Sequence, residues 1–297
     1  MNIRTNERKG ELYIVAEALL WSLFPVVTIL TFTDVSPLFS AALNTLISSL
    51  FFALVLTVKG GWRQFRNCPP WKDILVSTLF IGIILYAFFF LGLRHTTAGN
   101  AAIMGLMEVF FSFFILGVVI KHESLIPSQL FGGACMVAGA LFILLPKASG
   151  WHSGDLLVLA GTAFPPIGNM FAQRARARVS GEFILFARSI ISGLFLLALA
   201  FVFEPAPAMQ HMAASWQFLF LNGLILFGVS KILWIEGIRL IPITKAISLA
   251  SIGPLFTLVF AYFILSERVT IYQIAGFVPI AIGIYILTRT KGTAIAS

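Results

Sequence analysis

The sequence has few charged residues, and this shortage excludes a protein whose surface faces water on all sides. Charged residues make up 11% of the 297 positions and hydrophobic residues 59%, and the mean hydropathy is +0.97. A soluble domain carries about 25% charged residues, because its surface has to be solvated. Most of the surface of this chain must therefore face hydrocarbon, which predicts an integral membrane protein.

Cysteine and histidine are also scarce. The two cysteines, Cys68 and Cys135, lie in a basic loop and in an apolar run, so they cannot form a disulfide framework. The four histidines are scattered without metal-site spacing, and the chain has neither a Walker loop for ATP nor a nucleophile elbow. These absences argue against an enzyme and predict no cofactor and no metal.

The net charge of +8 does not indicate a nucleic-acid partner. The basic residues stand in short segments between apolar runs, where they act as topology signals. The chain also has no RNA-binding or helix-turn-helix pattern. We therefore predict no nucleic-acid binding.

Ten apolar stretches predict an all-α membrane protein, since a spanning helix needs about 20 mainly apolar residues. The first stretch follows Arg4, Arg8 and Lys9 as in a signal peptide, but its length and the lack of a small-x-small cleavage site predict a retained span. The predicted spans are 12–32, 37–57, 74–93, 97–120, 127–145, 154–173, 182–203, 215–235, 243–264 and 270–289.

The distribution of lysine and arginine predicts the orientation. With the N-terminus inside, fifteen basic residues fall in cytoplasmic segments, and only Arg94, Lys147 and Arg268 fall on the opposite side. Cytoplasmic loops of membrane proteins carry such an excess. The sequence therefore predicts N-in and C-in topology, an even number of helices, and a multi-pass protein of the cell inner membrane.

The two halves of the chain match each other at a shift of 144 positions. The register holds for polar residues as well as apolar ones, and the middle of each half needs a shift of 145. Five helices per half is an odd number, so the second copy enters the membrane from the opposite side. Such inverted repeats support alternating access to a site near the midplane. Matched pairs include Gly10 with Gly154, Ser36 with Ser180, Glu123 with Glu267, Gln129 with Gln273, Gly132 with Gly276, Gly139 with Gly283, and Gly92 with Gly237.

The second half carries a recognisable run. It begins Ile252-Gly253-Pro254-Leu255-Phe256-Thr257, continues through Phe263-Ile264-Leu265-Ser266-Glu267-Arg268, and ends with Gln273, Gly276 and Gly283. The run resembles the second repeat of EamA-type transporters in the drug/metabolite transporter superfamily. A weaker copy starts at Met107-Glu108-Val109, where Val109 replaces the usual proline, and His122 before Glu123 also departs from the pattern.

This resemblance covers essentially the whole chain. It implies ten helices around a central cavity and transport of amino acids, other metabolites or drugs, often outward and often coupled to protons. The boundaries that follow are a cytoplasmic N-terminus at 1–11, a first repeat at 12–145, a linker at 146–153, a second repeat at 154–289 and a cytoplasmic tail at 290–297.

Glu17 and Trp21 are the first candidates for a binding site. Positions i and i+4 share a helix face, so the carboxylate and the indole point the same way. A carboxylate beside an aromatic ring suits an amine-bearing solute through charge and cation–π contact. The alternative is that Glu17 reaches the cytoplasmic interface beside Arg8 or Lys9.

Glu108 lies midway along the span 97–120, where its side chain cannot easily reach water. An ionisable group at that depth is costly and usually faces the bundle interior or a wet cavity. Burial favours the protonated form of a carboxylate, which suits reversible protonation in a proton-coupled carrier. The alternative is a structural hydrogen bond to a neighbouring helix.

Lys231 shares a helix face with Trp234 in the span 215–235. It is a candidate counter-ion for Glu17 or Glu108, or a contact for a substrate carboxylate, and the alternative is that it reaches the cytoplasmic surface. Arg188 starts close to the cytoplasmic end of its span, and snorkelling is the favoured interpretation there.

Several further residues complete the expected site and its frame. Tyr86 sits too deep for an interfacial belt and is a candidate for cavity lining, although packing is the commoner role. Asn169 and Gln173 follow Pro165-Pro166, which with Pro25 and Pro254 should break their spans. Glu123 and Glu267 are interpreted as structural caps. The matched glycines Gly132, Gly139, Gly276 and Gly283, together with Gly133, are interpreted as helix-packing surfaces.

Together these features favour a secondary active transporter of small metabolites, amino acids foremost, that works by alternating access, exports its solute and couples to protons. The expected partners are a small-molecule solute, the lipid bilayer and protons. The sequence leaves the oligomeric state open, and a monomer is compatible with it. The alternative is a facilitative channel-like or exchanger protein for drugs, polyamines or nucleosides. A lipid-modifying enzyme would need a polar cluster at headgroup level, which the short loops lack.

Overall fold

A computed structural model describes residues 3–66, 69–115, 127–144, 153–241 and 243–289. The first half consists of these helices: α1 (Ile3–Ser22), α2 (Phe24–Thr31), α3 (Pro37–Val58), η1 (Gly61–Arg66), α4 (Trp71–Ser77), η2 (Thr78–Leu85), α5 (Tyr86–Leu93), α6 (Ala98–Gly105), α7 (Met107–Phe113) and α8 (Pro127–Leu144). No strand occurs within the described ranges.

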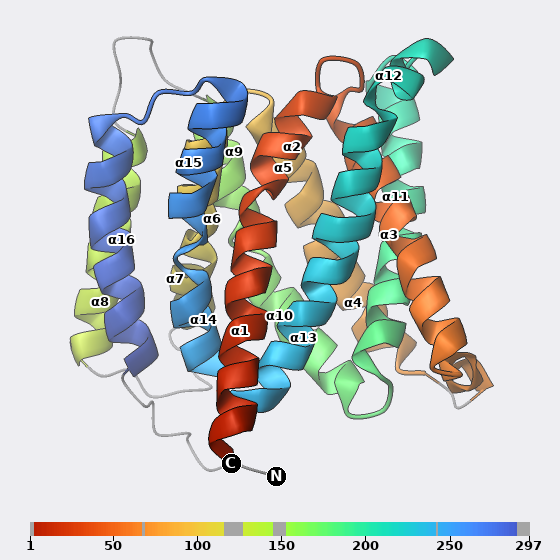
Figure 1. Cartoon of the computed structure of the whole chain (residues 1–297), viewed down its shortest axis with the longest axis horizontal. Coiled ribbons are helices and arrows are strands. Elements are labelled where there is room, and N and C mark those ends of the chain that lie inside the picture. Colours follow the sequence, from red (N-terminus) through yellow and green to blue (C-terminus); the bar gives the residue numbers. More distant parts are fainter. Residues whose placement is uncertain (1–2, 67–68, 116–126, 145–152, 242, 290–297) are drawn as a thin grey trace.

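The second half repeats this order of elements, except that no counterpart of η1 occurs among its described residues (Figure 1). Its helices are α9 (Ser153–Gly161), α10 (Pro165–Arg176), α11 (Gly181–Phe203), α12 (Met209–Phe220), η4 (Leu221–Val229), α13 (Ser230–Leu240), α14 (Ile243–Ala250), α15 (Gly253–Leu265) and α16 (Ile271–Arg289). In Figure 1, α1 runs upward whereas α9 and α10 run downward, so the two halves begin in opposite directions.

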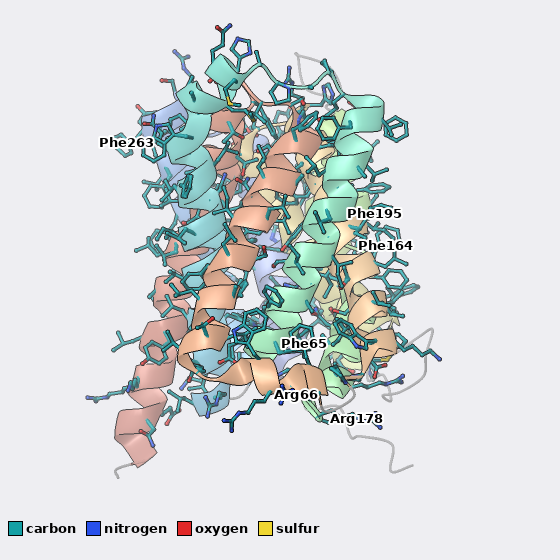
Figure 2. All side chains as sticks on the ribbon, turned by 90° about the vertical axis from the view of Figure 1, so that its right-hand side faces the viewer. Phe65, Arg66, Phe164, Arg178, Phe195 and Phe263 are labelled. Carbon is teal, nitrogen blue, oxygen red and sulfur yellow. The ribbon has the colours of Figure 1, made fainter. Side chains whose placement is uncertain are left out.

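Seven of the described helices are long and apolar enough to cross a membrane. They span Asn6–Thr31, Pro37–Val58, Trp71–Leu93, Pro127–Leu144, Gly181–Phe203, Met209–Leu240 and Ile271–Thr288, and two shorter apolar helices lie at Ala98–Phe113 and Gly253–Leu265. Large apolar side chains cover the outside of the bundle, as Phe195 and Phe263 show in Figure 2. The chain is a multi-pass membrane protein, because hydrocarbon is the solvent that suits such a surface.

Four of the predicted spans are broken into two helices. Breaks stand at Leu23, at 162–164 and at 251–252, each just before a proline predicted to interrupt its span. Proline removes a backbone donor and crowds the preceding turn, which explains these three breaks. The fourth break, at Leu106, has no proline, and it lies at the repeat position of the break at 251–252.

The segments η2 and η4 are π-helices, which the apolar sequence did not predict. The shift of 145 maps η2 onto positions 223–230, which overlap η4. A π-helix widens the backbone spiral and is often found at functional sites. Both halves therefore carry the same local distortion in the same helix.

Matched helices of the two halves pack against each other in antiparallel fashion. Along α3 and α11, Ser36 donates to Glu204 at 2.7 Å at one end, and Ser48 donates to Ser189 at 3.2 Å in the middle. Lys59 pairs with Glu182 at 2.6 Å at the other end. These contacts hold α3 of the first half against α11 of the second half. Exchanging the two halves gives approximately the same pair of helices.

Glycines allow α8 and α16 to touch backbone to backbone. A Cβ on Gly132 would lie 3.1 Å from the carbonyl oxygen of Gly283, and a Cβ on Gly276 would lie 2.8 Å from that of Gly139. Small residues let membrane helices approach this closely. The packing role predicted for these four glycines is confirmed, and their partners are each other.

The repeat also relates the contact between α1 and α13 to the contact between α5 and α9. A Cβ on Gly10 would lie 3.3 Å from the carbonyl oxygen of Gly237, and a Cβ on Gly92 would lie 2.8 Å from that of Gly154. Gly10 matches Gly154 and Gly92 matches Gly237 in the repeat. Close contact with Gly10 fixes α13 alongside α1, and this contact positions the charged groups described next.

Candidate functional site

Glu17 of α1 and Lys231 of α13 form an ion pair inside the bundle. Nζ of Lys231 lies 3.3 Å from Oε1 of Glu17, and the hydroxyl of Ser230 donates to the same oxygen at 3.3 Å. The Glu17 side chain is 5% exposed and that of Lys231 23%. Glu17 therefore does not reach the interface beside Arg8 or Lys9, and Lys231 is its counter-ion.

Trp21 lies on the same face, as the spacing of Glu17 and Trp21 predicts. Nζ of Lys231 is 3.3 Å from the centre of the Trp21 ring. The negative face of an indole attracts a cation, and the attraction increases where water is excluded. The ammonium group of Lys231 is therefore held from two sides, by a carboxylate and by a ring.

An aromatic cluster continues from Trp21 into the bundle. Trp21 stacks on Phe24 with ring centres 4.6 Å apart and contacts Phe227 of η4 at 5.6 Å. Tyr86 is 8% exposed and meets Phe227 edge to face at 5.1 Å. Tyr86 and Trp21 thus approach each other through Phe227, a residue that the sequence analysis did not select.

Glu108 of α7 and Asn169 of α10 form a second polar pair. The amide of Asn169 donates to Oε1 of Glu108 at 3.2 Å. Glu108 is half-buried and Asn169 is exposed. Glu108 also interacts electrostatically with Lys231, so the two acidic residues belong to one charged cluster.

Arg188 of α11 lies near this cluster, and whether its guanidinium reaches the cytoplasmic surface, as expected from the sequence, stays a prediction. Arg188 interacts electrostatically with Tyr86, Glu108 and Lys231, and its side chain is half-buried. A Cβ on Gly82 of η2 would lie 3.3 Å from Cγ of Arg188. The stem of Arg188 therefore lies against η2.

Trp234 and Gln173 are not brought into the charged cluster. Trp234 packs against the group formed by Ile14, Ile241 and Ala246, at the contact of α1 with α13 and α14. Gln173 is exposed near the end of α10. Six of the seven predicted site residues thus lie around one region, and whether they bind a solute stays a prediction.

Buried hydrogen bonds join helices at the end of the bundle that is uppermost in Figure 1, here called the upper end. Asn100 donates to Asp155 at 2.9 Å, Thr96 donates to the same carboxylate, and Gln273 donates to Asn100 at 3.0 Å. Asp155, Asn100 and Gln273 are each 3% exposed or less. This network ties α6, α9 and α16 together.

Glu267 has the capping role predicted for it. Its carboxylate accepts from the backbone amides of Ala98 at 3.0 Å and Gly99 at 3.5 Å, which begin α6. Burial raises the pKa of Glu267, and the two amide hydrogen bonds act in the opposite direction. Glu123, for which the same role is predicted, lies outside the described residues.

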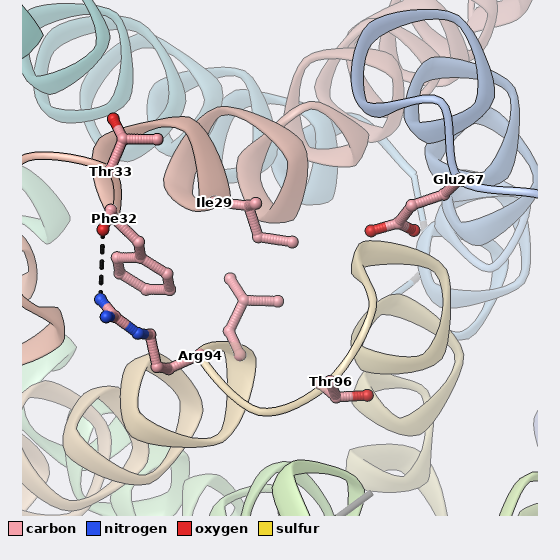
Figure 3. A pocket seen from close by; sticks show the side chains of 7 residues that line it. Ile29, Phe32, Thr33, Arg94, Thr96 and Glu267 are labelled. Atoms are coloured by element: carbon pink, nitrogen blue, oxygen red, sulfur yellow. Dashed lines mark hydrogen bonds between the residues drawn. The ribbon is translucent and has the colours of Figure 1, made fainter. Parts of the chain in front are cut away.

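A surface pocket of about 260 Å³ opens beside Glu267 (Figure 3). Arg94 lines it and donates to the carbonyl oxygen of Phe32 at 3.1 Å. None of the predicted site residues lines this pocket. It lies at the upper end, between the ends of α2, α5 and α6, and does not coincide with the charged cluster.

More exposed contacts hold the lower end. Lys245 pairs with Glu7 at 2.7 Å and also with Glu11, with side chains 36% to 49% exposed. Glu11 matches Asp155 of the upper network in the repeat. Equivalent positions in the two halves thus form a buried network at one end and a solvated ion pair at the other.

The chain is similar to known transporters over nearly its full length. The model of the EamA-like transporter family matches twice, over residues 8–145 and 152–289. The chain is 24% identical to the uncharacterized transporter YoaV of Bacillus subtilis, covering 95% of this chain and 97% of the relative. It is also 24% identical to the uncharacterized transporter sll0355 of Synechocystis, covering 97% and 92%.

The fold is also known from a solved structure. A crystal structure of a protein superimposes with a TM-score of 0.67 at 17% sequence identity, covering 93% of this chain and 95% of the other. At that identity the likeness concerns the fold alone.

A two-repeat helical bundle with interior charges, matched over both halves by relatives named as transporters, is that of a membrane transporter. The chain belongs to the EamA-like transporter family, whose model covers both of its halves.

Proposed function

We propose that this protein is a secondary active transporter of small metabolites, amino acids foremost, that exports its solute by alternating access. The observation that carries the proposal is the charged cluster of Glu17, Lys231, Glu108 and Arg188 between two antiparallel halves. Charged groups inside membrane segments are costly and mark solute or ion pathways.

The broken helices support the carrier mechanism. Interrupted helices at matching positions of inverted repeats border the binding sites of many carriers. Here α6–α7 and α14–α15 are interrupted at matching positions. In the proposal these two pairs and α9–α10 also span the bilayer, giving ten spans with both termini in the cytoplasm.

The different closures of the two ends support alternating access. The network at Asp155 is buried and ties helices together at the upper end, while the pairs of Lys245 with Glu7 and Glu11 are solvated. In the proposal, each half can adopt the conformation of the other. This change would open one end of the bundle and close the opposite end. Export to the upper side follows the direction that the family resemblance favours.

Glu108 is the proposed proton-coupling group. It is half-buried, it accepts one hydrogen bond from Asn169, and Lys231, Arg188 and Tyr86 are the other ionisable groups that face it. A carboxylate with both cationic and neutral partners can lose its proton and take it up again as the solute enters and leaves.

Uptake into proteoliposomes tests the proposal. Labelled amino acids, polyamines and nucleosides are presented with and without a pH gradient. We expect saturable uptake of at least one amino acid that increases with the gradient, and Glu108→Gln should abolish the increase. Absence of uptake for every solute would contradict the proposed function, and a gradient response that survives in Glu108→Gln would contradict the coupling role alone.

A facilitative channel or an exchanger for drugs, polyamines or nucleosides is the second candidate. The ion pair of Lys231 with Glu17 at 3.3 Å supports it, because a polyamine could replace the lysine ammonium. Flux through a channel would not saturate with solute concentration, whereas a carrier saturates. The same liposomes therefore separate the two mechanisms.

A further inference from the structure

Five buried polar side chains form a cluster where α2, α3 and η4 meet, in the upper half of the bundle (Figure 1). Each of the five is 0% exposed. The cluster joins the two repeats, because α2 and α3 belong to the first half and η4 belongs to the second. This polar cluster consists of Thr28, Thr31, Ser40, Asn44 and Asn222.

Hydrogen bonds connect the members of the polar cluster. Thr31 donates to the carbonyl oxygen of Thr28 at 2.7 Å, and its hydroxyl lies 2.8 Å from that of Ser40. The amide of Asn44 donates to the Ser40 hydroxyl at 3.5 Å. The amide of Asn222 donates to the Thr28 hydroxyl at 3.2 Å. A continuous chain of contacts therefore runs from α3 through α2 to η4.

Two amide oxygens of the polar cluster have no hydrogen-bond partner among the described residues. They are Oδ1 of Asn44 and Oδ1 of Asn222. The two residues also approach each other through the backbone, since a Cβ on Gly223 would lie 2.8 Å from the carbonyl oxygen of Asn44. A buried acceptor without a partner is costly, so this pair of oxygens indicates a ligand.

The direction of the Asn44 amide follows from the number of available hydrogens. The Thr31 hydroxyl donates to a carbonyl oxygen, so the Ser40 hydroxyl has to donate to Thr31. Ser40 has then used its single hydrogen and can only accept from Asn44. The nitrogen of Asn44 therefore faces Ser40, and its oxygen is the atom without a partner.

The fold itself does not require the polar cluster. At the shift of 144, the second repeat has Ala172, Ala175 and Ile184 at the positions of the two threonines and the serine. The second half thus forms equivalent helices with apolar side chains at these positions. A purely structural need does not explain why the first half is polar there.

The repeat also shows a positive charge in the equivalent place. Arg188 matches Asn44 at the shift of 144, and Ser77 matches Asn222 at the shift of 145. The stem of Arg188 lies against η2, just as Asn44 lies against η4. The contact of α11 with η2 thus includes a basic residue of the chain itself, whereas the polar cluster at the contact of α3 with η4 has none.

The helix ends at the polar cluster also favour a cation. Thr28 and Thr31 belong to the last turn of α2, which begins after the break at Leu23. The C-terminal end of a helix carries partial negative charge, and such ends of broken helices coordinate sodium in carriers. Asn222 lies in the first turn of a π-helix, a winding that is frequent at functional sites.

The partial positive charge at the start of α3 is offset by a carboxylate. Glu204 accepts from the backbone amides of Leu38 at 3.0 Å and Phe39 at 3.1 Å. A negative side chain at a helix N-terminus compensates the helix dipole. The N-terminal end of α3 therefore does not oppose a cation in the polar cluster.

We propose that Oδ1 of Asn44 and Oδ1 of Asn222 bind a sodium ion within the polar cluster. The five residues include no carboxylate, so the site suits a monovalent ion better than Ca²⁺ or Mg²⁺, which are bound with the help of carboxylates. They also include no group that takes up a proton near neutral pH, so this site is separate from Glu108. The bound ion connects the first repeat to the second.

The sodium site neighbours the aromatic cluster. Thr28 lies one α-helical turn after Phe24, and Asn222 lies one π-helical turn before Phe227. The rings of Phe24 and Phe227 are 5.2 Å apart, and both contact Trp21. The ion therefore lies beside the rings that lead to the charged cluster.

Thermal unfolding of the purified protein in detergent tests the site with sodium as the probe. Melting temperatures are measured over a series of sodium chloride concentrations, with choline chloride keeping the ionic strength constant. We expect the wild type to melt at a higher temperature as sodium increases, along a curve that saturates. Potassium should give a smaller increase at the same concentration. Binding of radioactive sodium to the immobilised protein measures the affinity directly.

Two variants remove one amide oxygen each, and both introduce small residues. Asn44→Ala and Asn222→Ser should each weaken sodium binding about tenfold or more, and the serine is the residue that the first repeat has at the matching position. Ser77→Ala is the matched control, because it removes the unpartnered hydroxyl of the equivalent contact. It should respond to sodium as the wild type does.

Asn44→Asp tests the charge of the ligand. It keeps an oxygen in the site and adds a negative charge that needs a cation when it is buried. At alkaline pH we expect a larger increase of the melting temperature with sodium than in the wild type. A variant that does not respond to sodium would count against the site, because a buried water molecule would give that result.

Three further results would overturn the inference. A wild type that melts at the same temperature in sodium and in choline would assign the two oxygens to a buried water molecule. An equal response to potassium would exclude the assignment to sodium. A sodium response that persists unchanged in Asn44→Ala and Asn222→Ser would place the ion elsewhere. No transported solute is present in these measurements, so the liposome panel tests the proposed function separately.

Discussion

Glu17 and Lys231 stand 214 positions apart in the chain, one in each repeat, and form a salt bridge of 3.3 Å in the interior of the bundle. Removal of one partner leaves a buried charge uncompensated, which typically costs about 3–5 kcal/mol. We therefore predict that Glu17→Gln and Lys231→Met each lower the thermal stability of the purified protein markedly.

The double variant Glu17→Gln/Lys231→Met is the control for this prediction. It removes both charges, so it should recover most of the stability that either single variant loses. Melting temperatures in detergent, followed by size-exclusion chromatography after heating, measure the cycle. Simple addition of the two single losses in the double variant would show that the groups do not stabilise each other.

Gly139 and Gly276 bring α8 and α16 into backbone contact, and a larger residue should separate them. A Cβ on Gly276 would lie 2.8 Å from the carbonyl oxygen of Gly139. We expect Gly276→Leu to destabilise by at least the ~1–3 kcal/mol typical of overpacking, measured as a lower melting temperature. Gly105→Ala is the matched control, because nothing lies within 4 Å of its added Cβ, and it should be neutral or stabilising.

Asp34 makes one contribution to stability that depends on pH. The Ser215 hydroxyl donates to its carboxylate at 2.7 Å and is the main reason that the pKa of Asp34 is lowered. The ionised form is thus favoured in the folded state. Its stabilisation is complete above the ordinary pKa of aspartate, about 3.9, and is lost as the pH falls through the lower folded value.

Ser215→Ala tests this dependence. We expect the wild type to melt at a higher temperature than Ser215→Ala near neutral pH, and the gap to shrink below about pH 4. Thermal unfolding between pH 7 and pH 3 measures it. A gap that is the same at both ends of this range would mean that the hydrogen bond does not depend on the charge of Asp34.

The two halves also predict a membrane topology. Gln64 and Ser180 exchange hydrogen bonds at 2.7 Å and 3.1 Å, so η1 and the start of α11 meet at one end of the bundle. In a variant without Cys68 and Cys135, we expect Arg66→Cys and Arg178→Cys to react with an impermeant thiol reagent only from the cytoplasm. Arg268→Cys should react only from outside, and labelling of Arg66→Cys and Arg178→Cys from opposite faces would overturn the inverted arrangement.

Much of the fold can be predicted from the sequence because bilayer crossing constrains it strongly. Apolar length, the repeat and the prolines predict the helices, their matching and three of the four breaks. The π-helices at η2 and η4 could not be predicted, since an apolar run has the same composition in either winding.

The sequence predicts which site residues share a face of one helix, but not which residues of different helices meet. The spacing of Glu17 and Trp21 places both on one face, and the structure confirms it with Lys231 between them. The choice of Glu17 over Glu108 as the partner of Lys231 depends on how α13 packs on α1. The contact of the Arg188 stem with η2 depends on Gly82, which lies in another helix.

Counterflow distinguishes alternating access from a channel in this protein. Proteoliposomes loaded with a high concentration of the unlabelled amino acid that the uptake panel identifies are diluted into a trace of the same labelled solute. Two halves that alternate around an interior site should accumulate label transiently above its outside concentration, and Glu17→Gln/Lys231→Met should reduce this accumulation. Label that only rises to the outside concentration would contradict the account, because that is the behaviour of a channel.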